Sequence, residues 1–257
     1  FMPVKTANLL AVDKMKQQVE ILGFKNDPEQ LSSTRYSWTN DLPLPAVVTA
    51  DVISGSFKLE VDWNVDPTIL TQKNIPTEMQ AITEAQDYLQ NANLLSEDLL
   101  LGQTKVTYLR ADVNKLVKAV SLSEADFVRV DFFRAKIDNL GVYTPNPDRG
   151  VVSVLFSGVR TSGKRVVEVN YNHFPVDYDQ SGTYPIKTSQ EAWAEMQSGQ
   201  GFVAKVDEIV KQIVVRKISL GYFDAPTPQN YLYPIYVFEG DGNFVGYVTA
   251  IASPWLE

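Results

Sequence analysis

The stretch "YLYPIYVFEGDGNFVGYVTAI" (231–251) decides the expected fold, because two β-forming runs flank a turn at Glu239 to Asn243. Side chains alternate between the two faces of a strand, and both faces of the first run are apolar or aromatic. One face carries Tyr231, Tyr233, Ile235 and Val237, and the other carries Leu232, Pro234, Tyr236 and Phe238. An interior strand is predicted, although Pro234 lacks an amide hydrogen and favours an edge or a bulge.

A helix, a strand and a hairpin are predicted in that order at both ends of the chain. Near the start, residues 6–22 carry apolar side chains at helical spacing, and a strand (33–39) and a hairpin (46–63) follow. Near the end, Thr188 and Glu191 form a capping-box pattern for a helix at 187–201, followed by a strand at 211–223. An internal duplication and convergence on a common α+β motif both explain this order.

The middle of the chain adds a helix and several strands. Residues 77–92 place Met79, Ile82, Ala85 and Leu89 on one helical face, and strands are predicted at 104–111, 125–137, 151–158 and 164–174. Hairpins dominate, so the expected class is α+β, with antiparallel sheets and helices packed on one face. Two lobes are expected, at residues 1–100 and 101–257.

Composition excludes several functions. The 257 residues carry a formal charge of −8, which disfavours nucleic acid and anionic membrane surfaces as partners. Cysteine is absent and His173 is the single histidine, so thiolate chemistry and multi-histidine metal sites are ruled out within one chain. No run of about 18 apolar residues is present. Phe1 precedes Met2, which suggests a longer protein whose leader or membrane anchor has been removed.

The segment "GVRTSGKR" (158–165) has the G-x-x-x-x-G-K spacing of a phosphate-binding loop. Such a loop is followed by Ser or Thr and then by a helix, whose amides hold the phosphate. Here Arg165 follows the Lys, and "RVVEVNY" behind it alternates as a strand. The segment is therefore predicted to be a hairpin turn.

The segment "DYDQSG" (177–182) is a candidate cation site. Asp177, Asp179 and Ser181 match the first half of a calcium loop, in which alternate side chains face the cation. The twelfth position is Thr188 and not Glu, so a solvated turn is the alternative. No other cofactor is predicted. His173 has no nucleophile motif near it, which argues against an enzyme.

Aromatic residues gather near the C-terminus and are the candidate binding residues. Tyr222, Phe223, Tyr231 and Tyr233 could line a groove for a peptide or a glycan, and core packing is the alternative explanation. Exposure of these tyrosines along a groove would favour binding.

The C-terminal third resembles a known family through "YPIKTSQEAWAEMQSGQGFVA" (184–204) and "ISLGYFDAPTPQNYLYPIYVFEGDGNFVGYVTAI" (218–251). These segments resemble the extracytoplasmic regulatory proteins of Gram-positive two-component systems, of the YycI and YycH type. More distantly, both helix-strand-hairpin units look like PepSY domains. The resemblance implies two PepSY-like lobes.

The resemblance also implies a function. Such a protein is bacterial, extracytoplasmic and tethered to the membrane by an N-terminal anchor that is absent from this chain. We therefore expect a non-catalytic module that binds or regulates another protein at the cell surface. Binding of a cell-envelope glycan or peptide through the C-terminal aromatics is the alternative.

Overall fold

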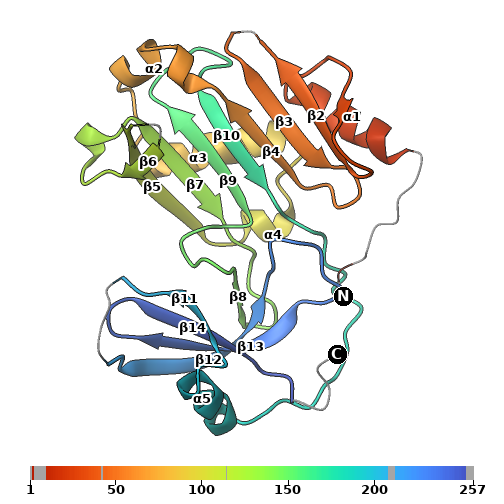
Figure 1. Ribbon diagram of the computed structural model, residues 1–257, viewed down its shortest axis with the longest axis vertical. Coiled ribbons are helices and arrows are strands. Elements are labelled where there is room, and N and C mark those ends of the chain that lie inside the picture. Colours follow the sequence, from red (N-terminus) through yellow and green to blue (C-terminus); the bar gives the residue numbers. More distant parts are fainter. Residues whose placement is uncertain (1, 3–9, 42, 114, 208–211, 253–257) are drawn as a thin grey trace. The chain divides into compact units, whose positions relative to one another are not determined.

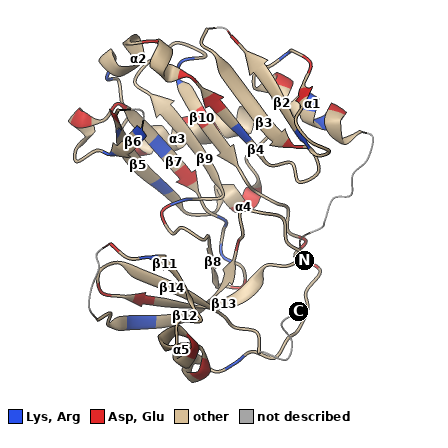
Figure 2. Ribbon diagram, viewed as in Figure 1, with Lys and Arg blue, Asp and Glu red and all other residues tan. Residues whose placement is uncertain are grey.

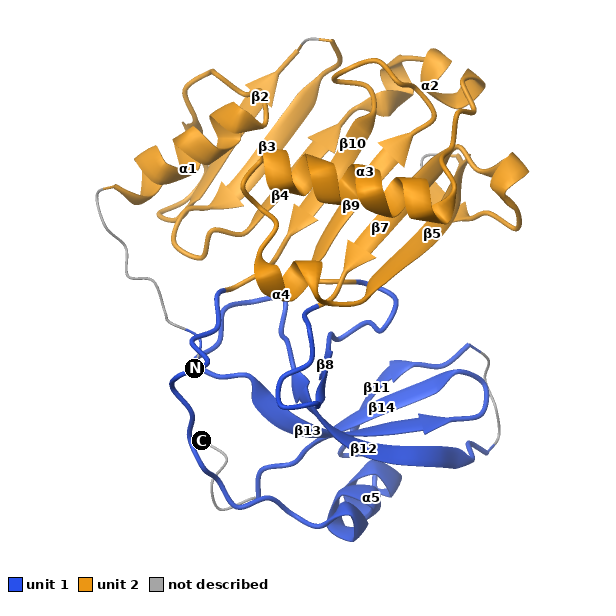
Figure 3. Ribbon diagram, turned by 180° about the vertical axis from the view of Figure 1, so that it is seen from behind, with its two compact units in different colours: residues 1–4, 134–149, 175–257 blue, residues 5–133, 150–174 orange. Residues whose placement is uncertain are grey.

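The chain forms two compact units, shown in Figure 3. The structure is a computed structural model that describes residues 2, 10–41, 43–113, 115–207 and 212–252. Unit 1 comprises residues 1–4, 134–149 and 175–257, and unit 2 comprises residues 5–133 and 150–174. The lobe boundary predicted after residue 100 does not coincide with this division, because strands from both sides of that boundary share one sheet.

That sheet belongs to unit 2 and has nine antiparallel strands in the order β1-β2-β3-β4-β10-β9-β7-β5-β6 (Figure 1). The strands are β1 (Glu29–Gln30), β2 (Arg35–Asn40), β3 (Ala46–Asp51), β4 (Phe57–Val61), β5 (Thr104–Asp112), β6 (Lys115–Lys118), β7 (Phe127–Phe132), β9 (Val152–Ser157) and β10 (Val166–Tyr171).

Two meanders meet at the middle of this sheet. Strands β2, β3 and β4 lie side by side in chain order, and so do β5, β7, β9 and β10, with β6 on the outer side of β5 and β8 in the other sheet. The last strand of each meander pairs with the other. Val169 lies opposite Leu59, and Tyr171 lies opposite Phe57 with their rings stacked at 5.3 Å. The β4–β10 pairing therefore joins both halves into one sheet.

Four helices belong to unit 2: α1 (Ala11–Ile21), α2 (Thr68–Thr71), α3 (Glu78–Asn91) and α4 (Glu97–Leu100). Short 3₁₀ turns lie at η1 (Trp63–Val65) and η2 (Leu122–Glu124). Helix α3 buries Ala81, Ala85 and Leu89, which recur every four residues, and it crosses one face of the sheet, in contact with β5 and β7 (Figure 3). Met79, predicted on the apolar face, is 79% exposed. The helix predicted at 6–22 is α1, and residues 6–9 lie outside the described part of the chain.

Unit 1 contains a five-stranded sheet in the order β11-β14-β13-β12-β8. The strands are β8 (Gly141–Tyr143), β11 (Phe202–Lys205), β12 (Val215–Phe223), β13 (Tyr233–Gly240) and β14 (Phe244–Thr249), and β8 alone pairs in parallel, with β12. Helix α5 (Ser189–Gln197) begins at the predicted capping box, in which Glu191 accepts from the Thr188 amide and its own amide donates to the Thr188 hydroxyl.

The predicted alternation along 235–238 is confirmed. Tyr236 and Phe238 pack in the core beside α5, and Ile235 and Val237 pack with Tyr247 on the opposite face. Strand β13 is central, as predicted. Pro234 is tolerated because it lies at the start of the strand, where its carbonyl accepts from the Ala250 amide at the end of the ladder.

The predicted α+β class of two PepSY-like lobes, with helices packed on one face, is wrong. Sheets of nine and five strands dominate the fold, and 20% of the described residues are helical. The largest buried side chains of unit 2 come mainly from strands, such as Trp38, Phe127 and Phe156. Each helix-strand-hairpin unit was expected to form a closed lobe. The N-terminal strands instead continue into the nine-stranded sheet, and the C-terminal strands pair with β8 from an earlier part of the chain.

Candidate functional site

A cavity of about 380 Å³ in unit 1 brings together most of the residues that the sequence singled out. Tyr222, Tyr231 and Tyr233 line it together with Asp177 and Ser181. Two groups that are far apart in the sequence, the aromatic cluster and the "DYDQSG" segment, therefore form one site. We call this cavity the tyrosine groove.

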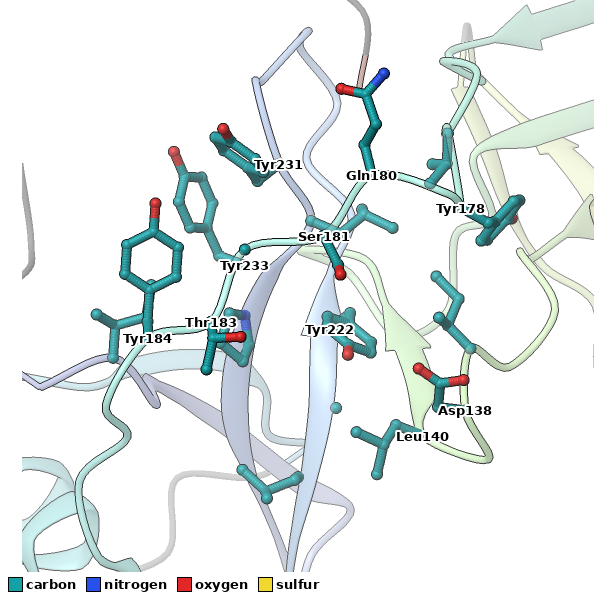
Figure 4. Close-up of a pocket in the computed structure, with 18 of the residues that line it drawn as sticks. Asp138, Leu140, Tyr178, Gln180, Ser181, Thr183, Tyr184, Tyr222, Tyr231 and Tyr233 are labelled. Atoms are coloured by element: carbon teal, nitrogen blue, oxygen red, sulfur yellow. The ribbon is translucent and has the colours of Figure 1, made fainter. Parts of the chain in front are cut away.

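Three tyrosines form a row along the groove. Figure 4 shows Tyr184, Tyr233 and Tyr231 with their hydroxyl groups directed the same way, and Tyr222 between this row and Asp138. The rings of Tyr231 and Tyr233 have centroids 6.5 Å apart and planes inclined at 63°. Tyr233 is 41% exposed, and Tyr222 and Tyr231 are half-buried, so all three are accessible to a ligand.

Residues 176–186 form one wall of the groove and are held at both ends. At the start, the Asp177 carboxylate accepts from the Asp179 amide at 3.0 Å and from Gln180 Nε2 at 2.8 Å. At the far end, the Ala252 amide donates to the carbonyl of Pro185, and Ile186 forms a β-bridge with Ile251. The wall is thus tied to the end of the five-stranded sheet.

A tight turn supplies the other end of the groove. Asp138 and Asn139 both have positive φ, and Ile137 and Leu140 exchange two backbone hydrogen bonds around them. Asn and Asp tolerate this conformation best, as in a two-residue hairpin turn. Asp138 was not predicted as a site residue, although the pair Asp138-Asn139 is typical of a hairpin turn. Tyr184 was not predicted either, although it lies two residues after the candidate segment 177–182.

Phe223 does not join the groove. Among the described residues, Phe223 does not line the cavity, although its cross-strand partner Tyr233 does. The Phe223 ring packs edge-on against Tyr247 at 6.1 Å, beside the cluster of Ile235 and Val237. Tyr247 is held there by its hydroxyl, which donates to the Thr144 carbonyl at 3.1 Å, and burial raises its pKa.

The three predicted calcium ligands do not converge. Asp177 and Ser181 line the groove and Asp179 does not, and the Asp177 oxygens already accept hydrogen bonds from their own loop. Among the described residues, no three His, Cys, Asp or Glu side chains are grouped so that they could hold a metal ion. The hydrogen bond from the Asp179 amide to Asp177 is the kind that an Asx turn forms.

His173 lies in unit 2 beside a carboxylate and a hydroxyl, but not as a catalytic triad. Its Nε2 lies 2.9 Å from Asp98 Oδ2 and 3.4 Å from Ser96 Oγ. A triad places the acid on one ring nitrogen and the nucleophile on the other. Here one nitrogen faces both, and the Ser96 hydroxyl donates to Asp98 at 2.5 Å. The cluster surrounds the start of α4, where Ser96 is the N-cap residue.

The segment 158–165 is a hairpin connection between β9 and β10, as predicted. Two of its three cations are neutralised within the fold. Lys164 Nζ donates to Asp66 at 2.6 Å, and Arg165 forms a two-pronged pair with Glu84 at 2.6 Å. No helix follows the turn, so it lacks the amide-lined N-terminus that a phosphate loop requires.

The tyrosine groove carries no positive charge. Among the described residues that line it there is no Lys, Arg or His, whereas Asp138 and Asp177 are present. The basic residues of β12, Arg216 and Lys217, stand at the other end of that strand (Figure 2) and pair with Asp241 and Glu239. The groove therefore disfavours anionic ligands.

Comparisons with known proteins do not assign a family. No protein-family model matches the chain, and no curated protein matches it. One solved structure, the Bacillus megaterium YpeB C-terminal domain, is similar over 97% of this chain and 95% of that chain. Its identity is 12% and its TM-score is 0.40, a likeness that is too low to support an inference. Within the described helices, none is long and apolar enough to cross a bilayer.

Proposed function

We propose that the protein is a non-catalytic binding module and that the tyrosine groove is its ligand site. One observation carries the proposal: three aromatic residues chosen from the sequence line a cavity of about 380 Å³ instead of filling a core. This size lies within the range of ordinary ligand sites. Tyrosine suits such a role because its ring gives apolar contact and its hydroxyl a hydrogen bond.

The chemistry of the site supports binding without catalysis. The described residues that line the groove include Tyr, Ser and Thr hydroxyls but no imidazole or amine that could activate them. His173, the single histidine, belongs to the other unit and shares its Nε2 between Asp98 and Ser96. Substrate activation by either set of residues has no geometric support.

The ligand that fits this site is neutral or basic. Asp138 and Asp177 contribute negative charge, and the whole chain has a formal charge of −8. We further propose that the ligand belongs to another protein at the bacterial cell surface. The resemblance of residues 184–204 and 218–251 to extracytoplasmic regulatory proteins motivates this part of the proposal.

A ligand-observed NMR experiment tests the proposal. The full chain is mixed with two probe sets, short neutral or basic peptides and neutral oligosaccharides, and saturation transfer is measured for each. Binding of any probe is expected to weaken in Tyr233→Ala and to persist in Phe202→Ala, because Phe202 is an exposed aromatic of the same unit outside the groove. If no probe binds in a Tyr233-dependent way, the proposal fails.

A further inference from the structure

We infer that the tyrosine groove binds a proline-rich peptide segment in the polyproline II conformation, with a Lys or Arg beside its prolines. This inference rests on the proposed function and names the ligand class of the same site. Four properties of the groove support this ligand class: its shape, the pairing of its strands, its hydrogen-bond donors and its charge.

The shape of the tyrosine row favours small apolar rings packed against it. The planes of Tyr231 and Tyr233 are inclined at 63° with their centroids 6.5 Å apart, so the two rings meet edge to face and their outer faces form an angled aromatic surface. A proline ring packs against aromatic faces of this kind from outside the pair. Aromatic-lined grooves of this kind are a recurrent mode of recognising polyproline II segments.

Strand pairing argues against a ligand that adds a β-strand. Residues Gly221–Phe223 of β12 pair with both β13 and β8, and β13 pairs with both β12 and β14. At Gly221–Phe223 the strand β12 therefore has no free edge, so addition of a ligand strand at these residues is blocked. A polyproline II segment needs no such edge, because it has no internal hydrogen bonds and docks with its side chains.

The groove offers donors, and proline-rich peptides offer acceptors. Within the described part of the chain, the amides of Ser181, Gly182, Thr183 and Tyr184 donate to no protein group. The hydroxyls of Tyr184 and Tyr233 project along the same row (Figure 4). Proline has a carbonyl but no N–H. A proline-rich segment therefore presents unpaired carbonyls to a surface that has unpaired donors.

Charge places a basic residue next to the prolines. The Asp138 carboxylate lines the groove and forms no ion pair in the described part of the structure. No Lys, Arg or His lines the groove among the residues described. A Lys or Arg of the ligand would gain a partner at Asp138, whereas an acidic residue would be repelled.

The test is fluorescence anisotropy with the full chain and three labelled peptides. The first is an oligoproline with one terminal arginine, the second has alanine in place of every proline, and the third has glutamine in place of the arginine. The first peptide is expected to bind about tenfold more tightly than the second. It is also expected to bind about threefold more tightly than the third at low salt, and less so at high salt.

Variants locate the binding. Tyr233→Ala is expected to weaken binding of the first peptide about tenfold, and Asp138→Asn about threefold. Asp138→Asn keeps the turn, since Asn also accepts positive φ. The matched control Asp179→Asn changes an exposed carboxylate that does not line the groove, and it is expected to have no effect. Unchanged melting temperatures show that Tyr233→Ala and Asp138→Asn remain folded.

The outcomes separate the two proposals. Equal binding of the proline and alanine peptides, or binding unaffected by Tyr233→Ala, overturns the inference. Tyr233-dependent binding of a neutral oligosaccharide without peptide binding also overturns the inference but leaves the proposed function standing. Absence of binding by every probe overturns both.

Discussion

Arg134 Nε donates to Asp224 Oδ2 at 2.9 Å, and both side chains are completely buried in unit 1. The backbone around the pair is also fixed, because the Asp224 amide donates to the Tyr143 carbonyl. This ion pair connects the segment before β8 to the end of β12, the strand that contributes Tyr222 to the groove.

Breaking this pair is expected to destabilise unit 1 strongly. Arg134→Met leaves a buried carboxylate without its cation, which typically costs about 3–5 kcal/mol. Urea unfolding followed by circular dichroism measures the loss. The control Arg216→Met removes an exposed pair with Asp241 and should change little. If both substitutions lowered the free energy of unfolding equally, burial of the Arg134–Asp224 pair would not increase its contribution to stability.

Asp66 is expected to lower the free energy of unfolding when the pH falls from 4 towards 2. Hydrogen bonds from Lys164 and then from Thr68 lower its pKa from 3.8 to about 2 in the folded state. Because the folded pKa is depressed, the stabilisation is present above pH 4 and is lost as the pH falls towards 2. Asp66→Asn should therefore melt lower than the unaltered protein at pH 6, and the difference should shrink towards pH 2. A difference that stays constant across this range would contradict the assignment.

Gly163→Ala is expected to destabilise unit 2 more than Gly23→Ala. Both glycines have positive φ, 76° and 100°, so both substitutions incur backbone strain. A Cβ at Gly163 would also approach Pro43 Cδ to 2.4 Å, whereas a Cβ at Gly23 meets nothing within 4 Å. The melting temperatures of the two variants measure the additional cost of displacing Pro43. Equal melting temperatures would mean that Pro43 moves away freely.

Ser96 is not expected to act as a nucleophile. Its hydroxyl donates to Asp98, so His173 does not receive its proton. A fluorophosphonate probe, which labels activated serines, should leave the protein unmodified at neutral pH. Labelling that disappears in Ser96→Ala would establish a reactive serine and overturn the non-catalytic proposal.

Calcium is expected to leave the melting temperature unchanged. A ligand that binds only the native state raises this temperature, and the scan is run with calcium and with a chelator. The Asp177 oxygens already accept from the Asp179 amide and Gln180. A calcium-dependent rise that is abolished by Asp177→Asn would restore the cation site that the sequence pattern suggested.

Local rules predicted the local elements well. The capping box of Thr188 and Glu191 and the alternation of Tyr236 with Val237 both depend on neighbouring residues alone, and the structure shows both. The helix predicted at 77–92 is also present, and Ala85 and Leu89 of its predicted apolar face are buried. Met79 of that face is exposed and Ala81 is buried in addition, because the sheet beneath the helix decides which side chains turn inwards.

Contacts between distant segments could not be predicted in the same way. Leu59 pairs with Val169 across the middle of the nine-stranded sheet, and nothing in either local pattern specifies this partner. The tyrosine groove also depends on contacts between segments that are distant in the sequence. Tyr222 and Tyr233 were identified by composition, but Asp138 joins them only because its turn lies beside β12 in the folded unit.

The chain enters and leaves unit 2 more than once, and this order has a consequence during synthesis. Residues 134–149 emerge from the ribosome before β9 and β10 but belong to unit 1, whose remaining strands are translated last. Unit 2 can close once residue 174 has emerged, while the early segment of unit 1 waits for its partners. The segments of the two units therefore alternate along the chain, and no single cleavage of the polypeptide can separate one complete unit from the other.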